Sequence, residues 1–408
     1  MTSNASPQWP QRNGAQRPAA ATNSSSERQA TTSSAIKEER RPTLSDLPKI
    51  AKRTSVASPQ SPPQDEPTAG TGTPPERPPK WYADLKVKNA RDKNFSNADT
   101  LLGRLSDDIR KCRTAGSGNR VPIFDKIREL LHIIVFVEVT PDLLKAKHML
   151  ENNGALAKLF DDQRSDGVNW PFDIKADARE LYNKWCDRVF ETDLLRGIKF
   201  HVKSVNDKKE GQKTTDSLDR TYPTTRSNYH GNGKLLNGQW WPLQICALRD
   251  GAHGSSQGGI HGRNDDCAYS VIMSGGTDST GKKYPDVDDG DEVLYCGTDS
   301  VNGKIAEATS HLIRSAEKKK PVRLLRSSNL GSQYAPEAGF RYDGLYDVVS
   351  FENLDGPESM RQRHQFKLKR QAGQDPIRAL GPERRPTQQE LDEYKKHKRL
   401  AGKIKGQV

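Results

Sequence analysis

The spacing of apolar residues changes once along this chain, and the change limits what the chain can fold into. Between residues 124 and 191, apolar residues recur three and four positions apart, which is the period of a helix with one buried face. Between residues 240 and 370 they form short runs rich in β-branched and aromatic side chains, bounded by Gly, Pro, Asn and Asp, which is typical of strands. The sequence therefore predicts an α+β, multidomain chain in which an all-α helical bundle precedes a β-rich domain.

The helical bundle is expected over residues 79–200. The segments with the helical period are residues 124–139, 140–160 and 173–191. Thr140 is a good N-cap because its hydroxyl accepts a hydrogen bond from a free N–H of the first turn, and Pro141 suits the first helical position. Asp173 is expected to cap the third helix in the same way.

Residues 120–190 resemble the N-terminal helical domain of transcription elongation factors of the TFIIS type. The resemblance rests on a leucine-rich segment followed by ALAKLF and then IKADARELYNKWC. It implies a module that docks a chromatin or transcription protein. The alternative is a helical bundle in which Trp185 is a core residue and nothing more.

The β-rich domain is expected over residues 237–370, as a sandwich or a partly open barrel. Its predicted strands are residues 240–248, 267–273, 292–296, 321–326, 344–351 and 364–370. Residues 307–320 interrupt the series with a helical pattern. We therefore expect a sheet domain that carries one or two helices.

The remaining segments lack an apolar period. Residues 1–78 are dominated by Ser, Thr, Pro, Gln, Asn and Ala, and this composition offers too little apolar surface to offset the entropy lost on ordering. We expect a disordered tail there. Residues 201–236 are predicted to be a linker or domain-edge segment, and residues 371–408 an exposed basic tail.

The formal net charge of +12 favours a polyanionic partner, because each phosphate neutralised by Lys or Arg releases a counterion. Nucleic acid is the first candidate. A generally solvated surface is the alternative. No apolar run approaches the roughly 18 residues of a spanning helix, and no apolar signal segment opens the chain, so neither a membrane nor secretion is expected.

The five cysteines are scattered, which suits free thiols in a reducing compartment. No CxxC pair is present, and the spacings of Cys246, His253, His261 and Cys267 fit no common set of metal ligands. The chain also lacks a nucleophile elbow, an HExxH motif and a phosphate-binding loop. The sequence therefore predicts no metal, no cofactor and no catalytic activity.

Residues 258–297 hold the densest group of informative positions. Gly275 and Gly276 follow a predicted strand, where glycines let a ligand approach the backbone closely. An acidic loop with Asp286 comes next, and Tyr295 ends the following strand. A carboxylate beside aromatic rings suits a nucleobase, whose ring stacks on tyrosine and whose exocyclic amine donates to aspartate.

Five ordered segments of this half of the chain resemble the SRA domain, also called YDG after the motif that stands here as Tyr342-Asp343-Gly344. They are GGIHGRNDDCAYSVIMSGG, YPDVDDGDEVLYCGT, KPVRLLRS, YAPEAGFRYDGLYDVV and FKLKR. The resemblance covers residues 240–370. It implies a curved, partly open β-barrel that binds DNA containing 5-methylcytosine and flips that base into a pocket.

The resemblance assigns roles to single residues. Tyr295 matches the tyrosine that stacks on the flipped base, and Asp286 matches the carboxylate that contacts its amine. Gly275 and Gly276 match the glycines that bring the backbone to the pocket. Cys296 stands where many members have Thr or Ser, so we expect an apolar wall for a methyl group and a weaker hydrogen-bond donor.

The second stacking tyrosine is displaced by an insert. In the family pattern a tyrosine directly follows the two glycines, whereas here Thr277 has that place and Tyr284 comes seven positions later. We expect Tyr284 to be the second wall, because its spacing to the acidic loop is close to that of the family. Thr277 in that role would weaken the stacking.

Residues around the pocket have expected roles as well. Gln257 matches a loop residue that enters the duplex and fills the gap left by the flipped base. His261 and Arg263 are expected to contact backbone phosphates, or else to belong to a loop anchored by its own hydrogen bonds. Residues 341–344 are expected to form a buried turn network rather than a ligand site.

The sequence thus predicts a nuclear, chromatin-associated protein that recognises 5-methylcytosine in double-stranded DNA and has no catalytic activity of its own. Two alternatives remain open. In the first, the pocket reads unmodified or differently modified DNA. In the second, the helical block recruits partners while the β-rich domain supplies only charge-driven DNA affinity.

Overall fold

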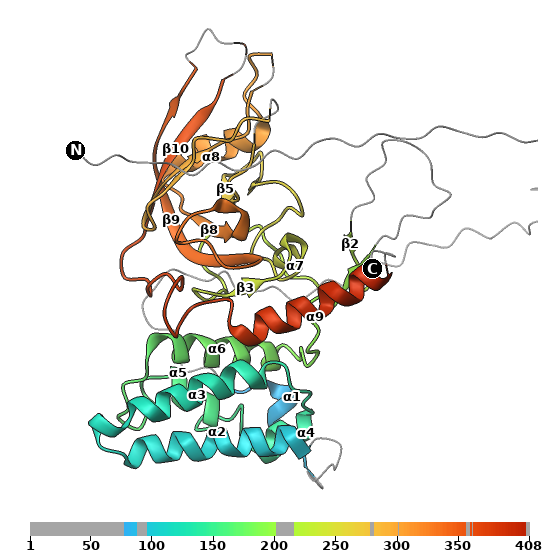
Figure 1. Cartoon of the computed structure of the whole chain (residues 1–408), viewed down its shortest axis with the longest axis vertical. Helices are drawn as coiled ribbons and strands as arrows, with labels where there is room; N and C mark the ends of the chain where they lie inside the picture. The colour runs from blue at the N-terminus through green and yellow to red at the C-terminus, as the bar shows by residue number, and fades with distance from the viewer. Residues whose placement is uncertain are drawn as a thin grey trace, which may run out of the picture. The chain divides into compact units, whose positions relative to one another are not determined.

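The computed structural model describes residues 77–87, 96–200, 216–277, 281–300, 302–355, 360 and 362–404 (Figure 1). These residues all belong to one compact unit, Gly70–Val408. The tail predicted over residues 1–78 lies outside the described residues except for its last two positions.

The short strand β1 (Ile198–Lys199), paired with β2 (Ser217–Leu218), ends the first described part, and the elements before it are helices, as the apolar period predicts. The helices are α1 (Lys80–Ala83), α2 (Ser96–Thr114), α3 (Val121–Ile134), α4 (Pro141–Ala146), α5 (Ala155–Phe160) and α6 (Phe172–Cys186). Their leucines and isoleucines share one core, in which Trp185 is 2% exposed. Its burial fits the reading of Trp185 as a core residue.

One of the two predicted helix caps is present. The hydroxyl of Thr140 accepts a 3.2 Å hydrogen bond from the N–H of Leu143, with Pro141 at the first helical position. The cap predicted at Asp173 is wrong, because α6 already begins at Phe172. The buried carboxylate of Asp173 instead accepts a 2.5 Å hydrogen bond from Arg128 of α3, and so joins two helices.

The second part is built on an eight-stranded sheet, whose main path runs β4-β5-β8-β9-β10-β7-β6 with β3 paired to β9. The strands are β3 (Trp240–Trp241), β4 (Ile260–Gly262), β5 (Ala268–Met273), β6 (Val287–Asp288), β7 (Glu292–Cys296), β8 (Val322–Ser327), β9 (Phe340–Asn353) and β10 (His364–Arg370). Neighbours are antiparallel except for β5 and β8, which α8 (Glu307–Lys318) separates in sequence. The closure of this sheet into a partly open barrel stays a prediction.

The strand predicted over residues 240–248 is wrong beyond its first two residues. Trp240 and Trp241 pair with β9, but α7 (Gln244–Arg249) follows directly. Pro242 explains the change, because a proline has no N–H to extend the ladder of hydrogen bonds. The helix still buries Ile245, so the apolar residues of this run pack into the core from a helix rather than from a strand.

The exposed basic tail predicted from residue 371 is also wrong over its first part. The side chains of Arg378 and Arg385 are 1% and 7% exposed, and both donate to the carboxylate of Asp177 on α6. A capping box between Thr387 and Glu390 then starts α9 (Gln388–Ile404). Residues 375–387 are therefore a packed connecting segment that joins the sheet to α6.

The predicted linker contributes to the sheet domain where the structure describes it. Arg323 of β8 is fully buried and donates to the backbone carbonyls of Ser227, Tyr229 and Gly231. Its guanidinium also lies 3.9 Å from the ring centroid of Tyr229. Three carbonyls and an aromatic face compensate this charge, so the segment around Tyr229 is a fixed edge of the domain.

Candidate functional site

The predicted pocket residues Asp286 and Cys296 are in direct contact. Cys296 ends β7, and its backbone N–H donates a 2.8 Å hydrogen bond to a carboxylate oxygen of Asp286. Burial raises the pKa of Asp286, although the N–H and the thiol of Cys296 pull it down. The arrangement holds a half-buried carboxylate that is ready to accept a further hydrogen bond.

Tyr295 lies beside that carboxylate and is 5% exposed. Its pKa is raised by burial first, and then by the nearby Asp286 and Tyr284. Burial likewise raises the pKa of the Cys296 thiol to about 12, with Asp286 adding to the effect. Both groups stay neutral at physiological pH and present apolar surface next to one carboxylate.

The described ends of the insert before the acidic loop lie close together. Thr277 and Lys283 face each other in an isolated antiparallel bridge, and the N–H of Tyr284 donates a 3.1 Å hydrogen bond to the carbonyl of Gly276. The insert thus leaves and returns at nearly the same point, which brings the half-buried Tyr284 back to the glycine pair. This geometry favours Tyr284 over Thr277 as the residue beside Tyr295.

Of the two predicted glycines, Gly275 has the stricter requirement. Its φ is +59°, and an added Cβ would lie 3.1 Å from the carbonyl oxygen of Asn329. A side chain there is disfavoured by both backbone and space. A Cβ on Gly276 would make only ordinary contacts, so neither the backbone conformation nor the available space requires a glycine at this position.

Gln257 is exposed on the loop between α7 and β4. The loop is fixed from inside, since the Ser255 hydroxyl accepts from the N–H groups of Gln257 and Gly258, and the Gly258 carbonyl meets the ring of buried His253 at 2.9 Å. At the end of this loop, a Cβ on Gly259 would lie 2.8 Å from the hydroxyl of Tyr295. The loop that carries Gln257 therefore passes directly beside the tyrosine.

His261 and Arg263 differ from the other predicted residues. The ring of His261 meets Asn228 at 2.7 Å, and burial lowers its pKa to about 4. Arg263 is exposed and forms an ion pair with Asp265. His261 thus matches the alternative reading, a side chain that anchors its own loop, while Arg263 stays available at the surface.

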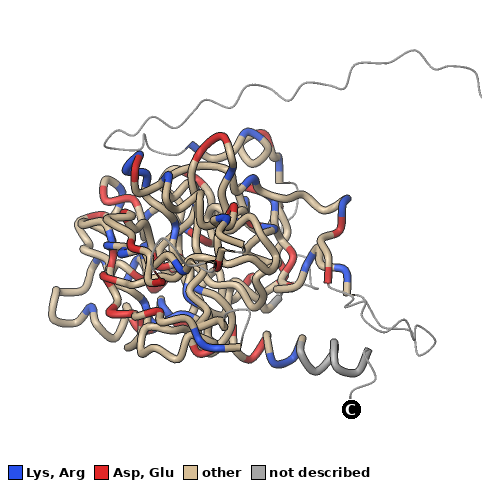
Figure 2. Tube along the Cα trace, turned by 90° about the horizontal axis from the view of Figure 1, so that it is seen from above, with Lys and Arg blue, Asp and Glu red and all other residues tan. Residues whose placement is uncertain are grey.

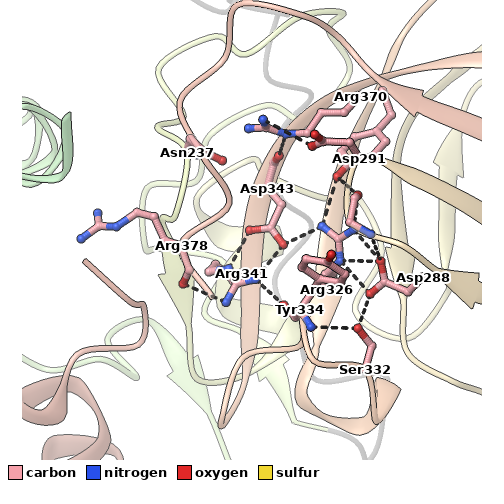
Figure 3. Close-up of polar contacts among 12 residues, drawn as sticks. Asn237, Asp288, Asp291, Arg326, Ser332, Tyr334, Arg341, Asp343, Arg370 and Arg378 are labelled. Carbon is pink, nitrogen blue, oxygen red and sulfur yellow. Dashed lines mark hydrogen bonds and ion pairs between the residues drawn. The ribbon is translucent and has the colours of Figure 1, made fainter. Parts of the chain in front are cut away.

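Beneath the acidic loop lies a buried network that runs through the YDG motif (Figure 3). The Arg326 guanidinium donates to Asp288, to the Gly290 carbonyl and to Asp343, all within 3.2 Å. Asp343 also accepts from Arg341. The predicted buried network around residues 341–344 is present, but it sits within strand β9 rather than in a turn.

Sequence reasoning missed two residues that hold the site, namely Arg326 and Gln365. One of them carried a usable signal. A charged residue inside an apolar strand run such as PVRLLR requires a buried partner, and Arg326 is 0% exposed between two aspartates. Gln365 carried no such signal, because its partners come from other strands.

The charges in this part of the chain are balanced. Residues 230–374 contain 18 Lys and Arg and 18 Asp and Glu. Figure 2 shows both signs interspersed along the described chain. The net positive charge of the protein therefore lies outside the segment that contains the pocket.

The described residues contain no cluster of three or more His, Cys, Asp or Glu side chains able to hold a metal. The five cysteines are all free thiols. No helix in the described ranges has the length and apolar character needed to cross a membrane.

A β-rich binding domain, with a carboxylate and two tyrosines gathered at the end of one strand, is the class that this fold and site define. Residues 230–374 match the SAD/SRA domain family, so this segment is an SAD/SRA domain. The match extends seven residues before and four residues beyond the limits expected from the sequence.

Named relatives share this part of the chain. A UHRF1-like protein of Cryptococcus neoformans is 34% identical over 161 residues, which covers 34% of this chain and 45% of that protein. The E3 ubiquitin-protein ligase UHRF1 of Danio rerio is 35% identical over 144 residues, which cover 28% of this chain and 18% of that protein. This chain thus spans less than half the length of these two relatives.

Among solved structures, the SRA domain of SUVH5 in complex with methylated CHH DNA is 28% identical, with a TM-score of 0.31. The alignment covers 37% of this chain and 99% of that domain. A TagI restriction endonuclease described as modification-dependent is 26% identical, with a TM-score of 0.31, over 36% of this chain and 54% of that one.

Proposed function

We propose that this protein is a nuclear, chromatin-associated reader that binds double-stranded DNA and recognises 5-methylcytosine by taking the base into the pocket of Tyr284, Asp286 and Tyr295. One observation carries the proposal. The residues that the SRA resemblance marks as pocket residues, although separated by an insert and a loop, meet at the end of β7.

The chemistry of the pocket fits cytosine. The exocyclic amine of cytosine is a donor, and a carboxylate held by one backbone N–H still has acceptor capacity for it. Two tyrosines offer faces for stacking, which contributes roughly 1–3 kcal/mol per base. The neutral thiol of Cys296 offers an apolar contact that suits a methyl group better than a polar substituent.

Gln257 completes the proposal on the DNA side. It is exposed on a loop that is fixed at its base and passes beside Tyr295. A side chain in this place can occupy the gap in the duplex and offset part of the unpairing energy of a few kcal/mol. Arg263 is assigned a phosphate contact, and His261 a role within the loop.

The alternative of charge-driven DNA affinity alone has little support from the residues. Residues 230–374 carry no net charge by count, so they offer little to a polyanion beyond specific contacts. The alternative of unmodified or differently modified DNA keeps one argument, the thiol of Cys296 in place of a hydroxyl. Recruitment of a chromatin or transcription protein by α1–α6, and the lack of catalytic activity, remain proposals.

The test compares binding of the full chain to two duplexes that differ only in cytosine or 5-methylcytosine at one position. Tyr295→Ala and Asp286→Ala serve as pocket variants, and Arg263→Ala as a phosphate-contact variant. We expect a preference for the methylated duplex that is lost in both pocket variants and kept in Arg263→Ala, which should weaken binding of both duplexes in parallel. Equal affinity for the two duplexes, unchanged by either pocket variant, would contradict base recognition.

A further inference from the structure

Gln365 connects the two halves of the pocket. It lies on β10, opposite Cys296 of β7 in the sheet register, and is 8% exposed. Its side-chain amide nitrogen donates to the carbonyl oxygen of Pro285 at 2.7 Å and to the sulfur of Cys296 at 3.7 Å. One buried side chain thus contacts the segment before the acidic loop and the residue that follows Tyr295.

The chemistry of these partners fixes the orientation of the amide. The carbonyl oxygen of Pro285 is an acceptor only, so the nitrogen of the Gln365 amide, not its oxygen, must face it. With this nitrogen also directed at the Cys296 sulfur, the thiol hydrogen is left to point elsewhere. Hydrogen bonding between that thiol and the carboxylate lowers the pKa of Asp286 against the effect of burial.

The contact with Pro285 joins the segment before the acidic loop to strand β10. Residues 284–286 precede β6 and belong to no strand. Their hydrogen bonds include those from the Tyr284 N–H to the Gly276 carbonyl, from the Gln365 amide to the Pro285 carbonyl, and from the Cys296 N–H to the Asp286 carboxylate. The bond from Gln365 ties the segment to β10, which pairs with both β7 and β9.

We infer that Gln365 is a positioning residue of the base pocket. Its amide sets the separation between the segment Tyr284–Asp286 and the end of β7, and with it the gap into which a planar base enters. This inference rests on the proposed function, since it assigns Gln365 a role at the same site. Gln365 itself touches two pocket-forming residues rather than the base.

Two variants separate positioning from space filling. Gln365→Met keeps an unbranched side chain of similar volume but removes the donor. Gln365→Glu keeps the shape and replaces the donor with a carboxylate, which becomes a donor again only when it is protonated. Gln371→Met is the matched control, because Gln371 follows the same strand and donates to exposed Asp347.

The measured quantity is the ratio of the affinities of the full-length protein for the 5-methylcytosine and cytosine duplexes. Both affinities come from one preparation, so a partly unfolded sample does not change the ratio. We expect Gln365→Met to reduce the ratio about fivefold or more, because the Pro285 carbonyl loses the donor that holds this segment in place. Gln371→Met should leave the ratio as in the wild type.

The pH dependence of Gln365→Glu provides the second readout. Relative to the wild type at each pH, its ratio should be low at mildly alkaline pH and rise at mildly acidic pH as the new carboxyl group is protonated. Gln365→Met should show no such recovery. A wild-type ratio in Gln365→Met, or a Gln365→Glu ratio independent of pH, would overturn the inference.

The outcomes also separate this inference from the proposed function. If Tyr295→Ala abolishes the preference for 5-methylcytosine while Gln365→Met keeps it, the proposed function stands and the role of Gln365 falls. If the wild type itself has no preference, the proposed function falls, and the inference falls with it.

Discussion

The guanidinium of Arg378 holds the carboxylate of Asp177 through hydrogen bonds of 2.5 and 2.9 Å, although 201 positions separate the two residues. Arg385 donates to the same carboxylate, and both side chains are buried. The last helix of the first part and the segment after the sheet are therefore fixed to each other by charge.

Asp177→Asn should destabilise the protein strongly. The change leaves two buried guanidinium groups without their shared charge, which costs about 3–5 kcal/mol for a broken buried pair. Asp187→Asn is the control, since Asp187 forms an exposed ion pair with Lys234 and its loss should cost no more than about 1 kcal/mol. Urea denaturation followed by circular dichroism measures both, and equal small losses would contradict a structural role for Asp177.

His253 should make the protein sensitive to acid. Burial lowers the pKa of His253 from its usual 6.5 to about 3, so between these pH values the unfolded chain binds a proton at this residue and the folded chain does not. The free energy of unfolding is therefore unaffected by His253 above pH 6.5 and decreases progressively as the pH falls towards 3. One pH unit below 6.5 the loss amounts to about 1.4 kcal/mol.

His253→Gln tests this prediction, because an amide can accept from Ser270 and donate to the Gly258 carbonyl as the neutral ring does. Thermal melts across the pH range should show a smaller loss of stability in acid for the variant. A parallel loss in variant and wild type would assign the acid sensitivity to other groups, with His261 the next candidate.

The affinity for the methylated duplex should fall on mild acidification. Ionised Asp286 is the stronger acceptor for the base amine, and burial has raised its pKa. The decline should therefore begin at a higher pH than an ordinary aspartate would produce. In Asp286→Asn the affinity should be weaker but flat over the same range, and a variant that declines like the wild type would rule out Asp286 as the titrating group.

Tyr284→Ala should weaken binding of the methylated duplex by about 1–3 kcal/mol, the usual contribution of stacking on one aromatic side chain. Thr277→Ala should have little effect, because Thr277 lies in the bridge that closes the insert. Fluorescence anisotropy titrations compare the two variants. A larger loss for Thr277→Ala than for Tyr284→Ala would reverse the assignment of the second wall.

Salt should weaken binding of both duplexes in parallel and leave their ratio unchanged. Counterion release acts on the phosphates, which the two duplexes share, whereas the preference arises in a segment without net charge. Titrations at increasing salt concentration provide the ratio directly. A preference that disappears with salt would point to charge, rather than the pocket, as its source.

The sequence predicted most of the sheet because its strands are short apolar runs between turn residues. Residues 364–370 match β10, and the helix predicted over residues 307–320 is α8 (Glu307–Lys318). Helix α7 could not be predicted from the same rule, since Gln244 is the only polar residue in WWPLQICAL and only Pro242 marks the change. Apolar periodicity does not distinguish a helix from a strand in a short run with a single polar residue.

The site was predictable in its residues but not in its supports. Resemblance to a family marked Asp286 and Tyr295, whereas Gln365 contacts Pro285 and Cys296, which lie 80 and 69 positions away in the sequence. The burial of Arg378 and Arg385 was hidden for the same reason. A basic composition predicts a solvated tail, and only the structure shows that the carboxylate of Asp177 pairs with both arginines.

The segment 375–387 also bears on where the SAD/SRA domain ends. Arg341 donates to the backbone carbonyls of Arg378 and Arg385, and the side chain of Arg378 fills the space beside Gly238, where a Cβ would lie 2.3 Å from it. The family match stops at residue 374. A fragment that ends at residue 374 would lack two hydrogen-bond acceptors of the Arg341 guanidinium. The smallest fragment that folds as in the whole protein is therefore longer than the segment that matches the family.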